Sequence, residues 1–348
     1  MSDPLVLGVE STCDETGVAL VRGRELLGDV TATSMDKYAR YGGIIPEIAS
    51  RAHLESFVPT LNAALDKAGV DLHDVDAIAV SAGPGLIGSL TVGISAAKAL
   101  AVALDKPIYG VNHVIGHLAV DELVDGPFPQ RFVGLIVSGG HSNILAINNI
   151  ATDVRELGGT LDDAAGEAFD KVGRLLGLPY PGGPHVDRLS QTGAPTKIRF
   201  PRGLSAAKDK ERHRYDFSFS GLKTAVARYV ESLRAQDQPI PSADICASFS
   251  EAVNDSLTAK AVQACLDTDC DTLVVGGGFS ANSHLRALAA ERCAAAGITL
   301  RLPPLRYCTD NGAQIAAIGS ALVRAGVAPS SLDFAPDSGM SLSQTVMP

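Results

Sequence analysis

The sequence lacks the patterns that mark membrane and secreted proteins. No stretch of about 18 uninterrupted apolar residues occurs, which argues against a membrane-spanning helix. The first residues, Met1 to Pro4, contain no basic segment followed by an apolar one, so a secretory signal is not expected. The six cysteines include no Cys-x-x-Cys pair, which favours reduced thiols over a disulfide framework or a four-cysteine zinc site. These absences predict a cytoplasmic protein.

Positive charge is scarce as well. The chain has 29 basic and 39 acidic residues, and its net charge of -10 argues against a general binder of polyanions. One local basic patch lies within residues 197–223, where cations and aromatic residues alternate in a way that suits single-stranded or loop RNA. Alternatively, this segment is a solvated loop whose phenylalanines face the core. The residues concerned are Lys197, Arg199, Arg202, Lys208, Lys210, Arg212, Arg214 and Lys223, with Phe200, Tyr215, Phe217 and Phe219 between them.

The pattern of apolar residues repeats within the chain of 348 residues, which is long enough for two domains. Residues 5–9 predict a buried strand, residues 10–17 a polar turn and residues 18–21 the returning strand of a hairpin. Residues 132–137 and 143–147 repeat this pattern further along the chain. Each hairpin is later followed by a strand that runs through glycines into a helix. The sequence therefore predicts two copies of one α/β unit that face each other across a cleft.

The first glycine-rich segment, Gly83-Pro84-Gly85-Leu86-Ile87-Gly88, matches the dinucleotide-binding pattern G-x-G-x-x-G. A dinucleotide fold also needs an acid at the end of the next strand, but the strand predicted near 108–111 ends in Asn112. The glycines are therefore better explained by tight packing of a strand against a helix, or by a turn that faces the substrate.

Two histidines, His113 and His117, lie four residues apart and would share one face of a helix. Asn112 can cap that helix, and Gly126-Pro127 would stop it. The pair could provide two ligands for one metal ion, or it could be two surface or capping histidines. Val114 stands where thermolysin-type zinc enzymes carry a catalytic Glu, which argues against a metalloprotease of that type.

Asp310 precedes a helix that is predicted from about residue 313 to near Gly326. By itself, Asp310 is best explained as the N-cap of this helix. It could also provide a carboxylate that completes a set of ligands with His113 and His117. Two histidines and one carboxylate suit iron(II) or zinc and leave coordination positions open for substrate or water.

Taken together, the motifs closely resemble the bacterial TsaD family, in order and from about residue 5 to about residue 325. Each motif alone is weak evidence, but the full set is highly specific. The matching segments are residues 8–16, 41–47, 81–86, 113–117, 137–141, 162–171, 180–184, 217–225, 276–282 and 309–312.

This resemblance implies an α/β fold of two duplicated lobes like those of actin, hexokinase and the chaperone ATPases. We expect a first lobe at 1–128, a second lobe at 129–325 with a basic insertion near 197–223, and a tail at 326–348 that packs back on the first lobe. Members of the family transfer the threonylcarbamoyl group of threonylcarbamoyl-adenylate to N6 of adenosine 37 in tRNAs that read codons beginning with A. AMP leaves. Bacterial members work with two smaller partner proteins, a truncated relative of the same fold and a nucleotide-hydrolysing subunit.

The resemblance also implies roles for individual residues. His113, His117 and Asp310 would hold Fe2+, or Zn2+ in its place. The residues that would line the bound adenylate are Ile136, Val137, Ser138, Gly139 and Gly140. The residues that would complete the nucleotide pocket are Asp170, Gly183, Asp187 and Asn282. Asp170 and Asp187 could instead cap helices or pair with Lys171 and Arg188.

No residue stands out as the general base. Asp14 and Glu15 lie at the first predicted hairpin tip and could assist proton removal from the amine, and His141 at the second tip is an equal candidate. Two functions of other classes remain, a metalloprotease and a nucleotide-dependent scaffold without transfer chemistry. The missing Glu after His113 argues against the protease, and the three candidate ligands argue against the scaffold.

Overall fold

The computed structural model describes residues 3–35 and 43–348. The chain forms two compact units. Unit 1 contains Met1–Gln130, Ile147–Arg155 and Pro303–Pro348, and unit 2 contains Arg131–Ala146 and Glu156–Leu302. The expected tail at 326–348 lies in unit 1, and so do residues 303–325, which were expected in the second lobe. Residues 41 and 42, which belong to one of the matching motifs, lie outside the described residues.

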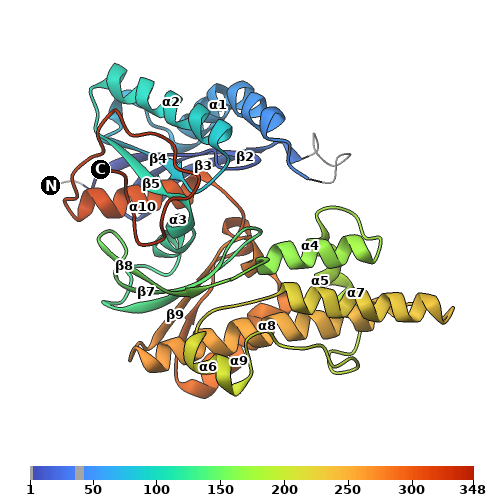
Figure 1. Cartoon of the computed structure of the whole chain (residues 1–348). Helices are drawn as coiled ribbons and strands as arrows, with labels where there is room; N and C mark the ends of the chain where they lie inside the picture. Colours follow the sequence, from blue (N-terminus) through green and yellow to red (C-terminus); the bar gives the residue numbers. More distant parts are fainter. Residues whose placement is uncertain (1–2, 36–42) are drawn as a thin grey trace. The chain divides into compact units, whose positions relative to one another are not determined.

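Unit 1 is built on a five-stranded mixed sheet in the order β3-β2-β1-β4-β5 (Figure 1). β1 pairs antiparallel with β2 and parallel with β4. All six residues of β1 are buried, as in a sheet covered on both faces. This confirms the first predicted strand and its hairpin. The strands are β1 (Leu5–Glu10), β2 (Glu15–Arg22), β3 (Glu25–Thr33), β4 (Ala77–Gly83) and β5 (Ile108–Asn112).

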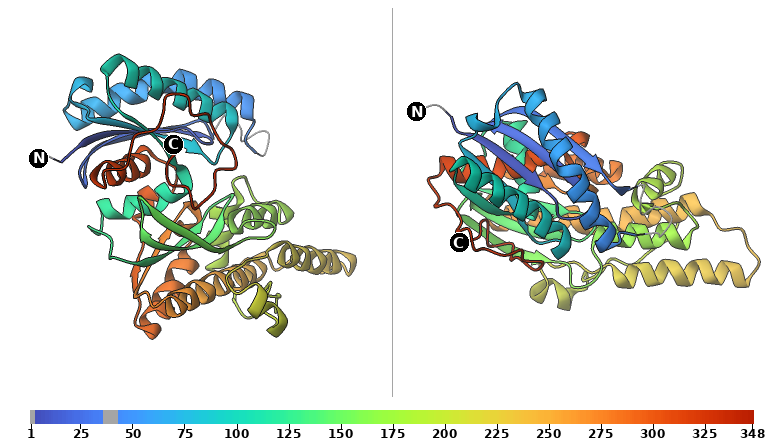
Figure 2. Two further views of the ribbon diagram at one scale, coloured as in Figure 1. Left: turned by 60° about the vertical axis from the view of Figure 1, so that its left-hand side comes forward. Right: turned by 90° about the horizontal axis from the view of Figure 1, so that it is seen from above.

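Helices cover both faces of the unit 1 sheet. α1 (Pro46–Ala68) and α2 (Ile87–Leu104) lie on one face, and α10 (Gly312–Arg324) lies on the other (Figures 1 and 2). The side chains of alternate residues of β2 pack on opposite faces of the sheet. Leu20 belongs to the core that includes residues of α1 and α2, while Ala19 and Val21 pack with residues of α10.

α2 is the one helix among the described residues whose length and mean hydropathy, 1.7, would allow it to cross a membrane. Its apolar side chains, including Leu90 and Ile94, belong to the core of unit 1. One such helix is therefore weak evidence for a membrane span, because the core helix of a globular unit has the same composition.

The glycines before α2 allow close packing. A Cβ atom on Gly83 would lie 1.9 Å from the carbonyl oxygen of Asp337, and one on Gly88 would lie 2.4 Å from Oγ of Ser50. Any larger residue at these positions would force backbone or neighbouring side chains apart. The structure thus favours tight packing, rather than a dinucleotide, as the reason for this motif.

Unit 2 repeats the sheet of unit 1. Its five strands lie in the order β10-β9-β6-β7-β8, which matches the first sheet strand for strand when each set is numbered along the chain. β9 pairs parallel with β6 and with β10. The predicted duplication is therefore confirmed. The strands are β6 (Phe132–Val137), β7 (Ser142–Asn149), β8 (Asp153–Gly159), β9 (Thr272–Gly276) and β10 (Thr299–Arg301).

The helices of unit 2 enclose an aromatic core. The ring of Phe169 in α4 lies with its centroid 4.8 Å from that of Phe249 in α8 and 4.7 Å from that of Phe279. All three side chains are buried. The helices are α4 (Ala165–Leu175), α5 (Gly182–Ser190), α6 (Ala207–Arg212), α7 (Ser220–Ala235), α8 (Ser242–Asp267) and α9 (Ser283–Ala296).

The phenylalanines of the basic patch at 197–223 are not exposed to a ligand. Phe200, Phe217 and Phe219 are at most 5% exposed and belong to the core of unit 2. The hydroxyl of Tyr215 donates to Asp267. The three phenylalanines therefore face the core, as the alternative interpretation expected, and cannot stack on RNA bases. Tyr215 is half-buried. The side chains of Lys208 and Lys210 lie outside what the structure describes.

Candidate functional site

β5 leads directly into the helix that carries both histidines, α3 (His113–Ala119). Asn112 caps this helix, because its Oδ1 accepts hydrogen bonds from the backbone N–H groups of Val114 (3.0 Å) and Ile115 (3.3 Å). The predicted helix start is confirmed, but α3 ends at Ala119, well before Gly126. His113 and His117 are buried, with ring centroids 4.8 Å apart. They lie on one face as predicted, and they are not surface residues.

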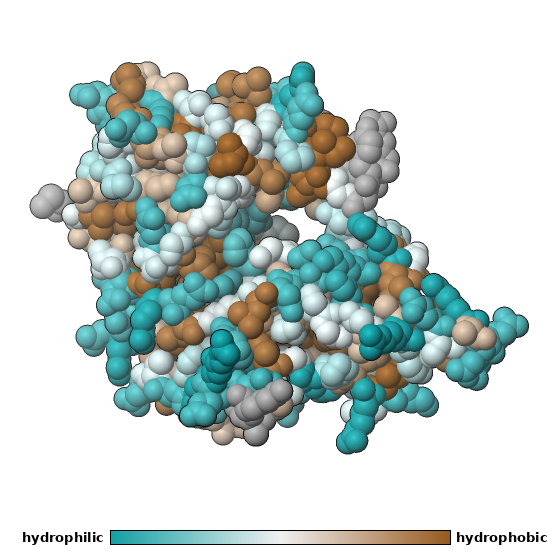
Figure 3. All heavy atoms as spheres, viewed as in Figure 1, coloured by the Kyte–Doolittle hydropathy of each residue, from teal (hydrophilic) through white to brown (hydrophobic). Residues whose placement is uncertain are grey.

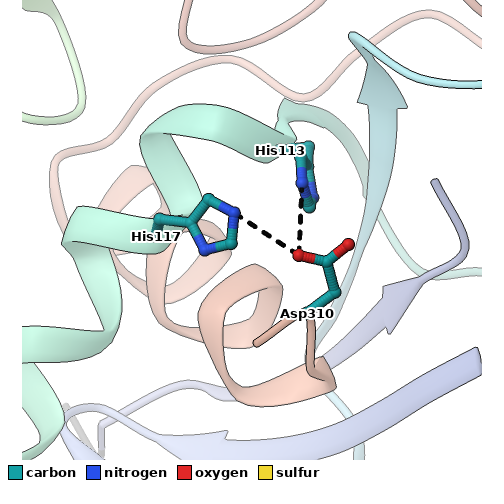
Figure 4. A group of neighbouring side chains, drawn as sticks. All are labelled: His113, His117 and Asp310. Carbon is teal, nitrogen blue, oxygen red and sulfur yellow. Dashed lines mark ion pairs between the residues drawn. The ribbon is translucent and has the colours of Figure 1, made fainter. Parts of the chain in front are cut away.

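Asp310 lies just before α10 and does not cap it. The N-cap is Asn311, whose side chain accepts from the backbone N–H of Gln314 at 3.0 Å. The carboxylate of Asp310 instead faces the imidazoles. Its Oδ1 lies 3.6 Å from Nε2 of His113 and 3.4 Å from Nε2 of His117 (Figure 4). The interpretation of Asp310 as an N-cap is therefore wrong.

The three side chains fit a single metal ion. One ligand atom from each lies within 4.8 Å of the others. Two ligand atoms that each lie about 2.05 Å from an ion, at tetrahedral angles, are about 3.3 Å apart. Both measured distances from Nε2 to Oδ1 are close to this separation. Two neutral imidazoles and one carboxylate suit iron(II) or zinc and leave positions open.

Glu10, the last residue of β1, is fully buried behind His113. Its Oε2 accepts from Nδ1 of His113 at 2.8 Å and from Nε2 of Gln314 at 3.3 Å. Its Oε1 accepts from the backbone N–H and from the hydroxyl of Thr12, both at 2.6 Å. A carboxylate that holds the Nδ1 proton directs the Nε2 lone pair of His113 towards Asp310 and any bound ion.

The sequence interpretation missed Glu10, because it assigned residues 10–17 to a polar turn. The available signal was an acid that directly ends an apolar strand. Such a residue is expected at the carboxyl edge of a sheet, where functional groups gather in α/β folds.

The electrostatics of the cluster suit a cation. Burial raises the pKa of Glu10, but the charge of His113 and the hydrogen bonds from His113 and Thr12 outweigh burial and bring this pKa to about 2. Burial lowers the pKa of His113, but the charges of Glu10 and Asp310 raise it to about 9. Burial, with the charges of Glu10 and Asp14, raises the pKa of Asp310 to about 6 against the attraction of His113. Without a metal, His113 is therefore in its doubly protonated, cationic form at neutral pH.

The hairpin tip between β1 and β2 lies beside this cluster and is held by His53 of α1. Nδ1 of His53 lies 2.8 Å from the hydroxyl of Thr16, and its Nε2 lies 3.0 Å from the carbonyl oxygen of Cys13. Burial, together with Asp14 and the charge of Asp310, raises the pKa of Glu15 to about 10. In the metal-free protein Glu15 thus holds its proton at neutral pH and cannot accept another.

In unit 2 the predicted adenylate lining follows β6, whose last residues Ile136 and Val137 are buried. Ser138 begins a tight turn, in which its N–H donates to the carbonyl oxygen of His141 at 2.8 Å. Gly139 and Gly140 are exposed, and a Cβ atom on either would meet no heavy atom within 4 Å. A ligand phosphate can therefore approach the backbone of this turn closely.

Asp170 of α4 lies against the start of α5. Its Oδ1 accepts from the backbone N–H of Gly183 at 3.0 Å. Burial raises the pKa of Asp170, although the N–H groups of Gly183 and Gly182 lower it. At the N-terminal end of α4, the N–H of Gly166 donates to the carbonyl oxygen of Ser138 at 3.2 Å. The glycine turn, α4 and the start of α5 are thus joined by direct contacts.

Asp187 and Asn282 bond to each other. Nδ2 of Asn282 donates to Oδ1 of Asp187 at 2.9 Å, and the hydroxyl of Ser283 donates to the same oxygen at 2.9 Å. Oδ1 of Asn282 caps α9 by accepting from the N–H of Leu285 at 2.8 Å. The carboxylate of Asp187 therefore fixes the start of α9. Lys171, which was a possible partner of Asp170, pairs with Asp163 instead.

Comparison with known proteins gives consistent matches. A sequence model of the family described as TsaD, tRNA N6-adenosine threonylcarbamoyltransferase, matches residues 25–317. Proteins with that name from Bifidobacterium longum and Bifidobacterium adolescentis are 58% and 57% identical over 347 residues, which is 100% of this chain and of each relative. The protein of that name from Corynebacterium diphtheriae is 54% identical and covers 97% of both chains.

Two solved structures share the fold. HypF from T. kodakarensis superimposes with a TM-score of 0.61 at 13% identity, over 93% of this chain and 48% of that chain. This chain thus corresponds to about half the length of HypF. Component A of (R)-2-hydroxyglutaryl-CoA dehydratase from Acidaminococcus fermentans gives a TM-score of 0.51 at 12% identity and covers 99% of that chain. The expected fold class, a duplicated α/β fold like those of actin, hexokinase and the chaperone ATPases, is confirmed.

Proposed function

This chain belongs to the TsaD family of tRNA N6-adenosine threonylcarbamoyltransferases, and on that basis we propose that threonylcarbamoyl-adenylate is its donor. The acceptor is N6 of adenosine 37 in tRNAs that read codons beginning with A, and AMP leaves. The observation that carries this proposal is the identity of 54% to 58% with relatives of that name over nearly the whole chain. The reaction takes place in the cytoplasm, where unmodified tRNA is available.

We assign His113, His117 and Asp310 to Fe2+, with Zn2+ as the alternative, one ion per subunit. When bound, such an ion supplies a Lewis acid that can polarise an oxygen of the donor. Glu10 fixes the ring of His113 through the bond to Nδ1. The burial of both histidines excludes water from the ligand side of the site. These contacts support an ion held by rigid ligands.

We propose that the donor phosphate binds at the glycine turn of unit 2, residues 138–141. The N–H groups of Gly139 and Gly140 stabilise its charge, while that of Ser138 holds the turn by donating to His141. Ile136, Val137 and Ser138 line the same end of β6. Asp170 and Gly183 complete the nucleotide pocket on α4 and α5. Asp187 of α5 and Asn282 at the start of α9 also take part in this pocket, and Nδ2 of Asn282 donates to Asp187.

The attacking amine is a poor nucleophile, because its lone pair is delocalised into the adenine ring. The carbonyl of the donor, a mixed carbamic-phosphoric anhydride, is already activated. Rate therefore comes chiefly from holding the two reactants in place and from stabilising charge on the carbonyl and phosphate oxygens. Asp14 and Glu15 at the hairpin tip are our candidates for the group that accepts the proton of the amine, and in the metal-free protein Glu15 holds its own proton.

Two smaller partner proteins complete the reaction, a truncated relative of this fold and a nucleotide-hydrolysing subunit. We propose that one of them docks on α1 and α2, where Figure 3 shows apolar residues over unit 1. Leu54, Val58 and Val102 are 71%, 58% and 65% exposed there. Exposed apolar side chains gathered on two helices are typical of a protein interface. Val58→Glu should weaken complex formation in size-exclusion chromatography, while the binding of metal to the isolated chain is unchanged.

One assay separates the proposed function from its competitors. Purified protein, both partners, threonylcarbamoyl-adenylate and unmodified tRNA are incubated, and the nucleosides are analysed by mass spectrometry. We expect threonylcarbamoyl-adenosine with the wild type, and neither bound metal nor product with His117→Ala. Cleavage of a peptide without modified adenosine would favour a protease, and nucleotide binding without transfer would favour a scaffold. Full metal content in His117→Ala would refute the ligand set.

A further inference from the structure

The C-terminal segment of unit 1, residues 341–347, lies along β5, the strand that leads into α3. The N–H of Met347 donates to the carbonyl oxygen of Gly110 at 2.7 Å, and the N–H of Asn112 donates to that of Thr345 at 2.9 Å. Val111 and Val346 form an antiparallel bridge between these bonds. The segment therefore extends the sheet by a short strand-like pairing next to the metal-binding helix.

Ser330 ties the same segment to β5 a second time. Its hydroxyl accepts from the N–H of Gly110 at 3.0 Å and donates to the carbonyl oxygen of Met347 at 2.7 Å. Phe334 and Met347 are buried in the core of unit 1. The position of the segment is thus fixed by packing as well as by hydrogen bonds.

The side chain of Asn112 joins this segment to α3. Nδ2 donates to the carbonyl oxygens of Ser341 and Gln344, both at 3.0 Å. Oδ1 accepts from the N–H groups of Val114 and Ile115. An asparagine amide has two donors and two acceptor sites, and all four are used here. The side chain of Asn112 is fully buried, so rotation of the amide would break all four hydrogen bonds.

We propose that Asn112 is a positioning residue for the metal centre and that the C-terminal carbonyls of Ser341 and Gln344 act through it. This inference rests on the proposed metal site and deepens it. His113 follows Asn112 directly, and His117 lies one turn further on. Because α3 has only seven residues, its start determines where both imidazoles point. The link to the C-terminal segment therefore helps to hold the two Nε2 atoms at ligand spacing.

The capping function and the link to the C-terminal segment can be separated by substitution. Asn112→Ser keeps an oxygen that can cap α3, since Ser and Asn are comparable N-caps, but it removes both donors to the segment. Asn112→Asp also keeps the cap, and it places a negative oxygen against two carbonyl oxygens. If only the cap mattered, the serine variant would equal the wild type.

The test is a titration of the isolated full-length chain with Co2+, followed by visible absorption. We expect Asn112→Ser to weaken Co2+ binding by about 10- to 100-fold, the usual effect of losing a group that orients a ligand. The intensity or position of the Co2+ bands should change as well, which loss of stability alone would not cause. Asn112→Asp should have a larger effect.

A matched control is available in unit 2. Asn282 also caps a helix through Oδ1 and donates from Nδ2 to a neighbour, so Asn282→Ser removes the same chemical group in the other unit. It should leave the affinity for Co2+ and the spectrum unchanged. Ser330→Ala provides an independent test, because it loosens the C-terminal segment without changing any atom of Asn112 or α3. We expect the same direction of change as for Asn112→Ser.

The outcomes are distinct. A folded Asn112→Ser variant with the affinity and spectrum of the wild type would overturn this inference and leave the proposed function standing. If that variant fails to fold, Ser330→Ala decides, and an unchanged affinity there overturns the inference. A wild type that binds no Co2+ would overturn the metal centre and this inference together.

Discussion

Substitution of Glu10 tests whether a buried carboxylate controls the metal site. In Glu10→Gln the side chain keeps its shape but one oxygen becomes an NH2 group. The carboxylate accepts four hydrogen bonds, from Nδ1 of His113, Nε2 of Gln314 and two groups of Thr12. A glutamine amide can accept on one side only. Either of its orientations therefore places donors against donors.

The two orientations have different consequences. With the NH2 group towards Thr12, two buried donors lose their acceptor, at about 1 to 3 kcal/mol each. With the NH2 group towards His113, Nδ1 must become an acceptor, and the ring proton moves to Nε2, where it blocks the metal. We expect the affinity for Zn2+ to fall by about 10- to 100-fold, which is about 1.4 to 2.8 kcal/mol at 1.4 kcal/mol per tenfold.

The assay is competition for Zn2+ with a chromophoric chelator at neutral pH, with far-UV circular dichroism as the check on folding. Glu15→Gln is the control. Because Glu15 holds its proton at neutral pH, glutamine resembles its native form, and the affinity should be unchanged. A folded Glu10→Gln protein that binds Zn2+ as tightly as the wild type would refute the role assigned to Glu10.

Three further predictions follow from single contacts. Since the pKa of His113 is raised to about 9, binding of the ion must displace a proton from Nε2. The affinity for the metal ion should therefore rise about tenfold per pH unit towards pH 9. Calorimetry in buffers of different ionisation enthalpy should detect the released proton, and the absence of proton release would contradict the assignment. Gly8→Ala places a Cβ atom 2.2 Å from the backbone nitrogen of Ala316 in α10, so denaturant unfolding should show a loss of about 1 to 3 kcal/mol, and an unchanged midpoint would refute this packing. Phe169→Ala removes a buried ring between two others and should cost about 3 to 5 kcal/mol in the same assay, whereas a loss typical of a surface residue would contradict its place in the core.

Much of the fold could be predicted from the pattern of apolar residues. The strands at 5–9 and 132–137 are continuous apolar runs, as buried central strands are, and their repetition revealed the duplication. β3 and β8 were not predicted, because edge strands are partly exposed and mix polar with apolar residues. The aromatic residues of the basic patch could not be oriented from composition, since the same residues fit a loop that binds RNA and one that packs on a core.

The site was predictable only in part. The spacing of His113 and His117 follows from helix geometry and needs no tertiary information. Asp310 was open to two explanations, because both Asp310 and Asn311 are good N-caps and only the structure shows which one caps α10. Glu10 was missed because its partner, His113, is 103 residues away. Such a contact forms only because β1 and β5 lie on either side of β4 in the sheet.

The distribution of charge is the strongest physical argument for a cation at this place. A buried ion needs compensating charge, and a divalent ion with neutral imidazoles is balanced by Glu10 and Asp310 together. Without the ion these negative charges attract protons instead. They raise the pKa of His113 to about 9, and they contribute to the raised pKa values of Glu15 and Cys13. For Glu15 and Cys13 burial is the largest cause, but for His113 the negative charges outweigh burial. The raised pKa of His113 therefore indicates a site with excess negative charge, which a bound cation would neutralise.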